Sequence, residues 1–316
     1  SNSLPLNLSV KHALLGGFVH EMTSGAIYAA LEARKRGVMK NRSYEERHQA
    51  ALGVFDAFMG GSVAEPERGA RSFRRQHGAL GTFAFDVVMG DVWSRSQLSP
   101  RDRSLIVISV LATIGSTEEL SLHTEVGLNN GLTRSEIEEI IIHVAAYAGF
   151  PMAMQASRVV TSRFCEIDGV DRLPERKGAA ELSDVERRER AHEVRKSLTG
   201  GRCADDIEAD YAALVEHLGE VGVIAYHWAF GDLWARTELN RRDRSMAVIS
   251  ILTVLSRIDE LAFHIPAGLN HGLSRVEIEE IMVQMTIYGG IPRAVEGIHA
   301  AKGAFAKIDA RGNNPS

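Results

Sequence analysis

Two glutamate–histidine pairs are the residues of this chain best suited to chemistry. Glu119 precedes His123 by four positions, and the same spacing separates a second pair, Glu260 and His264. Residues four apart on a helix share a face, and the neighbouring residues are largely apolar, so each carboxylate is expected beside its imidazole. A buried carboxylate orients the ring and raises its pKa, which gives a proton donor near neutral pH. The alternative is a structural hydrogen bond that joins two helices.

The two pairs occupy matching places in an internal duplication. The stretch that starts GDVWSR at Gly90 aligns without a gap with the stretch GDLWAR that starts at Gly231, and about half of the positions are identical. Because this repeat is far longer than a solenoid unit, it indicates a duplicated domain. Polar residues that both copies keep are therefore candidates for a shared function.

Helix signals dominate both copies. Capping boxes are predicted at Thr133 with Glu136 and at Ser274 with Glu277, and Ser99-Pro100 is typical of a helix start. Apolar residues recur at helical spacing, whereas alternating runs joined by hairpin turns are missing from the sequence. The sequence predicts an all-α protein. We divide it into an N-terminal extension (1–42), a first copy (43–167), a linker (168–182) and a second copy (183–310).

Composition narrows the function classes. The 316 residues are 45% hydrophobic and 24% charged with a formal net charge of -5, which is typical of a soluble globular protein and does not favour nucleic-acid binding. No apolar run approaches the roughly 18 residues of a membrane span, so we expect no membrane association and a cytoplasmic location. Cys165 and Cys203 lie far apart without a CxxC, which excludes a cysteine-rich zinc site but leaves one disulfide open.

The kept motifs together resemble a known family. GDVWSR, RDRSL, the Glu-Leu pair that precedes His123, GLNNG and EIEE closely resemble the carboxymuconolactone decarboxylase family, over about four fifths of the chain. The resemblance implies two fused helical domains related by a pseudo-twofold, with the fold of the alkylhydroperoxidase D-type proteins. Because single-domain relatives resemble ring-like hexamers, it also implies a homotrimer that forms a pseudo-hexamer. Redox relatives carry a reactive cysteine where Glu119 and Glu260 stand, so a thiol peroxidase is disfavoured.

Further site residues come from other positions that both copies keep. Arg103 and Arg244 open a long apolar helix in each copy, and each is expected either to hold a substrate carboxylate or to form a salt bridge to a nearby aspartate such as Asp102 or Asp91. Four aromatic residues are candidates for lining a substrate pocket or for core packing: Trp93, Trp234, Tyr147 and Tyr288.

The copies also differ in ways that predict two unequal sites. Asn130 of the first copy is matched by His271, and His143 is matched by Gln284 in the second. A single histidine and a single glutamate make a poor metal site, so neither a metal nor another cofactor is expected.

The family resemblance, together with these residues, implies a cofactor-independent decarboxylase of a small carboxylated lactone, similar to 4-carboxymuconolactone, in the degradation of aromatic compounds. An arginine would hold the carboxylate, a histidine would transfer a proton and a glutamate would orient the imidazole. Two alternatives remain open. One is a cofactor-free isomerase, cyclase or other lyase on the same scaffold, and the other is a non-enzymatic ligand-binding or assembly protein.

Overall fold

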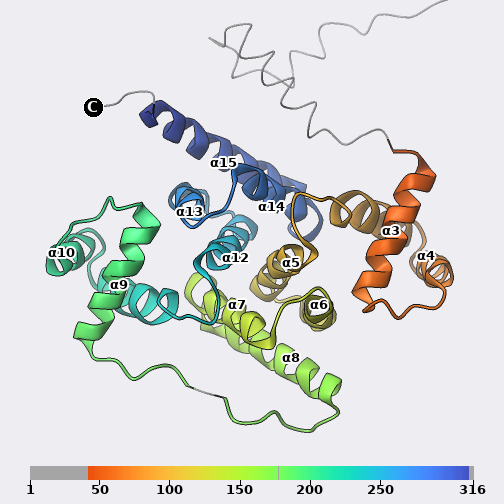
Figure 1. Cartoon of the computed structure of the whole chain (residues 1–316), viewed down its shortest axis with the longest axis horizontal. Coiled ribbons are helices and arrows are strands. Elements are labelled where there is room, and N and C mark those ends of the chain that lie inside the picture. The colour runs from red at the N-terminus through yellow and green to blue at the C-terminus, as the bar shows by residue number, and fades with distance from the viewer. Residues whose placement is uncertain (1–41, 177, 313–316) are drawn as a thin grey trace, which may run out of the picture. The chain divides into compact units, whose positions relative to one another are not determined.

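The computed structural model describes residues 42–176 and 178–312 of the chain (Figure 1). The predicted N-terminal extension therefore lies outside the described residues, apart from its last residue. Residues from Arg47 onward form one compact unit, and the account below concerns that unit. Within the described part of the chain, no helix has the combination of length and apolar character that crossing a membrane requires.

Helices make up both copies, and the described residues contain no strand, which confirms the all-α prediction. The first copy consists of α3 (Tyr44–Phe58), α4 (Pro66–Phe83), the π-helix η1 (Ala84–Trp93), α5 (Pro100–Ile114), α6 (Thr117–Asn129), α7 (Arg134–Tyr147) and α8 (Phe150–Asp168). The second consists of α9 (Asp184–Thr199), α10 (Ile207–Leu218), α11 (Glu220–Ile224), the π-helix η2 (Ala225–Trp234), α12 (Arg241–Val254), α13 (Ile258–Asn270), α14 (Arg275–Tyr288) and α15 (Ile291–Gly312).

Local sequence explains where these helices begin. The side chain of Ser99 accepts a hydrogen bond from the backbone of Asp102, with Pro100 in the first turn of α5. Thr133 and Glu136 form the predicted capping box at the start of α7, and α14 begins with the same box. Each cap satisfies backbone N–H groups that the first turn leaves without a partner.

The core is built around α5 and α12, which lie side by side near the middle of Figure 1. Both helices are buried along most of their length. Helix α5 contacts α14 of the other copy, and α12 contacts α7 in the matching way; η1 contacts α14 and η2 contacts α7. These reciprocal pairs are what a pseudo-twofold between the copies produces. One apolar cluster runs through both copies, so they share a core, and the boundaries drawn at residues 167 and 183 stay predictions.

Candidate active site

Three side chains from three helices form the first candidate site, which we call the His123 cluster. His123 lies within α6, Trp93 ends η1, and Tyr288 ends α14 of the other copy. The indole Nε1 of Trp93 donates a hydrogen bond to the Tyr288 hydroxyl oxygen at 2.9 Å, and that oxygen lies 3.3 Å from Nε2 of His123. The Tyr288 ring meets the imidazole edge-on, with ring centroids 5.3 Å apart. A residue of the second copy thus completes a site of the first.

The second candidate site, the His264 cluster, repeats this arrangement with the copies exchanged. His264 lies within α13, Trp234 ends η2, and Tyr147 ends α7 of the first copy. Trp234 Nε1 donates to the Tyr147 hydroxyl oxygen at 2.9 Å, and that oxygen lies 3.4 Å from Nε2 of His264. In both clusters the tryptophan ends a ten-residue π-helix, a rare element that is frequent at functional sites.

The hydrogen bonds favour one tautomer of each imidazole. Each tyrosine oxygen already accepts the indole N–H, so its own hydrogen is free to bond Nε2 of the histidine. Nε2 then accepts, and the proton of the neutral ring lies on Nδ1. Nδ1 of His123 and Nδ1 of His264 are both buried and have no hydrogen-bond partner among the described residues. Each cluster therefore presents one N–H that no neighbouring side chain or backbone group uses.

Burial keeps both histidines neutral near pH 7. His123 is 3% exposed and His264 is 5% exposed. Burial lowers the pKa of His123 to about 4. Burial, with a further contribution from the charge of His271, lowers the pKa of His264 to about 3. A neutral imidazole that donates from Nδ1 is suited to binding a developing negative charge, because it needs no proton from solution to do so.

The predicted glutamate–histidine contact is absent from both clusters. Glu119 is exposed in the first turn of α6, where its charge favours the helix start, and no hydrogen bond or ion pair of the described residues joins it to His123. Glu260 is exposed in the same place on α13. The expectation that a glutamate raises the histidine pKa is therefore wrong, because burial dominates and lowers it.

The exposed glutamates act on the tyrosines instead. Burial raises the pKa of Tyr288 above its ordinary value; the Trp93 hydrogen bond lowers it, and the charge of Glu119 adds to the rise. The pKa of Tyr147 is raised in the same way, with Glu260 as the acidic neighbour. The tyrosine hydroxyls therefore stay protonated and able to donate across the pH range in which proteins are stable.

Arg103 is not placed to hold a substrate carboxylate. Its side chain is fully buried, and its guanidinium donates to Glu280 at 2.7 Å, to Gln284 at 2.8 Å and to the carbonyl oxygen of Arg95 at 2.9 Å. Glu280 also receives two hydrogen bonds from the Arg95 side chain. The sequence alternative, a salt bridge, describes Arg103 better, although its partner is a glutamate of the other copy rather than Asp102.

Arg244 of the second copy is likewise paired with a glutamate of the first copy. It is fully buried and donates to Glu139 at 3.0 Å, and it also donates to the carbonyl oxygens of Leu233, Arg236 and Leu239. Both arginines are therefore part of the packing between the copies, and neither guanidinium is available to a ligand. Sequence reasoning missed this because each partner glutamate lies in the other copy.

One group of described residues has the spacing of metal ligands. His192, Cys203 and Asp210 place one ligand atom each within 4.8 Å of one another. The carboxylate of Asp210, however, accepts two hydrogen bonds from Arg195 at 2.8 Å and one from the Tyr226 hydroxyl at 3.0 Å. A positively charged guanidinium so close makes this group a poor cation site. Cys203 and Cys165 are both free, so the disulfide that the sequence left open is not formed.

Sequence comparison agrees with the fold and with the duplication. The sequence model of the carboxymuconolactone decarboxylase family matches residues 79–162 and 225–303, one stretch in each copy. The 4-carboxymuconolactone decarboxylase of Acinetobacter baylyi is 38% identical over 78 residues, which cover 25% of this chain and 58% of that protein. The nitrosuccinic acid decarboxylase of Metarhizium robertsii is 38% identical over 74 residues, which cover 23% of this chain and 51% of that protein.

The matches thus span little more than half the length of either relative, whereas the family model covers half of this chain in two separate copies. Both relatives carry the name of a decarboxylase. The two matched stretches contain the tryptophan, histidine and tyrosine of both clusters. The chain belongs to the carboxymuconolactone decarboxylase family.

Proposed function

We propose that this protein is a cofactor-independent decarboxylase whose two active sites are the His123 cluster and the His264 cluster. The observation that carries the proposal is the buried, neutral histidine of each cluster, whose Nδ1 has no hydrogen-bond partner in the described residues. An unpaired buried donor costs free energy, of the order of 1–3 kcal/mol, so its presence at both matching positions favours a ligand that accepts from it.

The names of the two relatives suggest the class of substrate. A carboxylated lactone and a nitro-substituted succinic acid both place a carboxylate near a group that can accept electrons. When carbon dioxide leaves, the carbon–carbon bond breaks and its electron pair moves into that acceptor group. We propose a small acid of this kind for the present chain, with a 4-carboxymuconolactone-like lactone from aromatic-compound degradation as the first candidate.

The cluster geometry fits this chemistry. The acceptor group gains negative charge on oxygen as the bond breaks, and the Nδ1–H of His123 or His264 donates a hydrogen bond to that oxygen. Trp93 and Tyr288 hold the His123 ring in the tautomer that makes this possible. A proton from water then completes the product at carbon. Glu119 and Glu260, at the exposed ends of their helices, are the groups that we propose carry it.

An assembly of three chains remains part of the proposal. Large apolar side chains are exposed at matching places in the two copies: Leu80 and Phe83 in the first, Val221 and Ile224 in the second. Paired patches of this kind suit a closed ring in which each copy contacts a neighbouring chain. Sedimentation equilibrium should give three times the chain mass, and a monodisperse monomer would remove this part of the proposal.

The decisive experiment measures release of carbon dioxide from 4-carboxymuconolactone and from nitrosuccinate by the metal-stripped protein. The double variant His123→Gln, His264→Gln should lose about 100-fold or more in kcat, because it removes the proposed donor from both sites. The exposed His299→Gln variant is the control and should retain full activity. A helical circular dichroism signal must be unchanged in each variant. Undiminished turnover in the double variant would exclude the proposed sites, and binding without turnover would favour a ligand-binding protein.

A further inference from the structure

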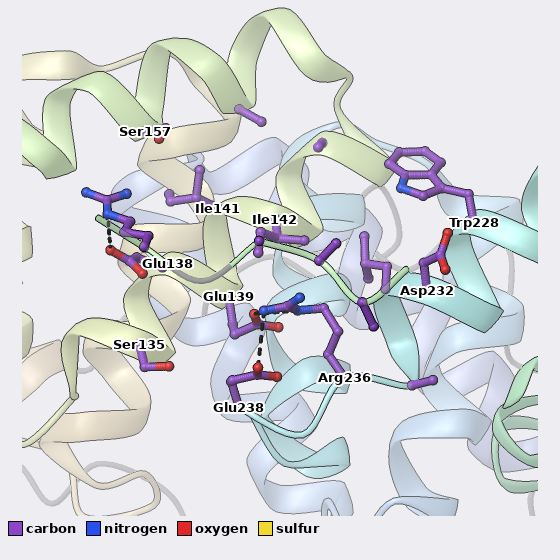
Figure 2. A pocket seen from close by; sticks show the side chains of 18 of the residues that line it. Ser135, Glu138, Glu139, Ile141, Ile142, Ser157, Trp228, Asp232, Arg236 and Glu238 are labelled. Atoms are coloured by element: carbon purple, nitrogen blue, oxygen red, sulfur yellow. Dashed lines mark hydrogen bonds and ion pairs between the residues drawn. The ribbon is translucent and has the colours of Figure 1, made fainter. Parts of the chain in front are cut away.

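A pocket of about 810 Å³ lies beside α7, α8 and η2 (Figure 2). This volume is typical of sites for drug-sized molecules. Ile141, Ile142 and Leu233 contribute apolar wall, and the rings of Phe150 and Trp228 stack at its edge with centroids 5.3 Å apart and planes 22° from parallel. Neither His123 nor His264 lines it.

The carboxylates of the pocket are already neutralised. Figure 2 shows Arg236 between Glu139 and Glu238, and it pairs with them at 2.6 Å and 3.4 Å. Two further acids that line the pocket are paired as well: Glu138 with Arg176, and Asp232 with Arg187. With Arg244 also bound to Glu139, four arginines balance four acids.

Arg190 is the remaining cation among the described residues that line the pocket. It lines the pocket from α9, is exposed, and has no hydrogen bond or ion pair among the described residues. Its charge acts on Glu186, one turn earlier on the helix, and lowers the pKa of that carboxyl, after the hydrogen bonds from Ser183. The pocket therefore combines an apolar, partly aromatic wall with one positive charge that forms no hydrogen bond or ion pair among the described residues.

The pseudo-twofold relates this pocket to a second place in the molecule, which we call the other half, and the two places carry different residues. At the positions that match Phe150 and Trp228, the other half carries Ile291 and Val87. Arg190 is matched by Ala50, because Arg187 and Arg47 bind the equivalent aspartates of their copies. The aromatic pair and the free arginine are thus missing together from the other half, whereas the histidine clusters occur in both.

We propose that this pocket binds one amphipathic aromatic carboxylate per chain, separately from the two histidine clusters. The aromatic body of the ligand packs against Phe150, Trp228 and the apolar wall, where it removes exposed apolar surface from water. Its carboxylate pairs with Arg190, the one lining cation of the described residues that forms no hydrogen bond or ion pair there.

The test is isothermal titration calorimetry of the full chain with 2-naphthoate, with 2-naphthylmethanol as the neutral analogue. Each of the three pocket substitutions introduces the residue that stands at the matching position of the other half. Trp228→Val and Phe150→Ile should weaken binding of naphthoate about tenfold, because they remove the aromatic wall. Arg190→Ala should weaken naphthoate about threefold and leave the alcohol unchanged. Ile291→Val, in the other half, is the matched control and should bind naphthoate as the wild type does.

Three results would overturn the proposal. The first is equal affinity of the wild type for naphthoate and for the alcohol, since the free arginine would then contribute nothing. The second is loss of naphthoate binding in His264→Gln, which would place the ligand at a histidine cluster. The third is a Trp228→Val protein that binds naphthoate normally but sediments with a lower mass, which would identify the pocket as a contact between chains. Thermal unfolding of every variant checks that each is folded.

Discussion

The His123 cluster and the His264 cluster share three hydrogen-bonded side chains but have different neighbours. In the first, Phe58 of α3 meets Trp93 edge-on, with ring centroids 4.6 Å apart, and lies 5.9 Å from His123. In the second, the residue that matches Phe58 is Leu198, and the phenylalanine next to the histidine is Phe263, its neighbour in α13, with ring centroids 5.1 Å apart. Each cluster therefore has a phenylalanine beside it, which comes from α3 in the first and from the histidine's own helix in the second.

The polar neighbours differ as well. Asn130 of the first copy donates a hydrogen bond to Ser104 at 2.9 Å. Its counterpart, His271, lies between Ser245 at 2.7 Å and Ser197 at 3.0 Å. Burial lowers the pKa of His271 to about 4, so this ring is neutral at pH 7 and stays in its hydrogen bonds.

The two clusters therefore share their hydrogen bonds but differ in their neighbours. The tryptophan–tyrosine–histidine chain is the same in both clusters to within 0.1 Å in its matching distances. The residues around the two clusters differ, whereas the hydrogen bonds from tryptophan to tyrosine to histidine are the same. We therefore expect the two clusters to perform one reaction and to differ in how well they accept a given substrate.

The largest expected effect concerns the two buried arginine–glutamate groups between the copies, one around Glu280 and one around Glu139. It tests whether loss of the glutamate lowers stability equally in both. Glu280→Gln leaves Arg95 and the fully buried Arg103 without a carboxylate, which should lower the free energy of unfolding by about 3 kcal/mol. Glu139→Gln should cost clearly less, because Arg244 donates to three backbone carbonyls, whereas Arg103 donates to one.

Urea unfolding of both variants measures this difference. The Nε of Arg103 has no partner even in the native protein, so its side of the molecule begins with the poorer hydrogen bonding. A Glu139→Gln variant that is destabilised as much as Glu280→Gln would contradict the idea that backbone acceptors compensate Arg244.

A second prediction concerns the exchange of tyrosines between the copies. Tyr288→Phe removes the hydrogen bond that orients His123, a loss of about 1–1.5 kcal/mol or roughly tenfold in rate at that cluster. Combined with His123→Gln it damages one cluster only, whereas combined with His264→Gln it damages both. The second combination should be about tenfold less active in decarboxylation, and the pair of combinations built on Tyr147→Phe should show the opposite order.

Steady-state kinetics of the four double variants decides the matter. Equal activity within each pair would mean that the tyrosines do not act across the copies. Because the order reverses between Tyr288 and Tyr147, a general loss of stability cannot imitate the expected pattern.

The all-α fold could be predicted from the sequence because helix signals depend on neighbouring residues. The capping box of Thr133 and Glu136 depends on four consecutive residues, and its prediction was correct. The histidines were found because both copies keep them. Tyr288 was named as a pocket or core candidate, but its pairing with His123 was not predicted, because the two residues lie 165 positions apart and the packing of α14 against η1 joins them.

Two errors have the same physical origin. Helical spacing places Glu119 near the face of His123, but it does not show that α6 buries its middle and leaves its first turn exposed. Arg103 was expected to hold either a substrate carboxylate or a nearby aspartate, because its partner, Glu280, belongs to the other copy. Local patterns determine where helices start, whereas burial depends on contacts between distant segments.

The smallest expected effect is a difference in acid sensitivity. Burial lowers the pKa of His143 to about 3, with the charge of Arg244 adding to the shift, whereas the matching position in the second copy holds Gln284. A histidine has a pKa of about 6.5 when unfolded, so below pH 6.5 the unfolded chain binds more protons than the folded one. His143 therefore contributes stability above pH 6.5 that is lost as the pH falls towards 3, and His123, His264 and His271 add to the same trend.

His143→Gln should reduce the fall in unfolding free energy between pH 6.5 and 5.5 by about 1 kcal/mol, as measured by urea titration at each pH. The exposed His299→Gln serves as control. An unchanged slope in His143→Gln would show that this ring does not titrate on unfolding, and that the two halves do not differ in this respect.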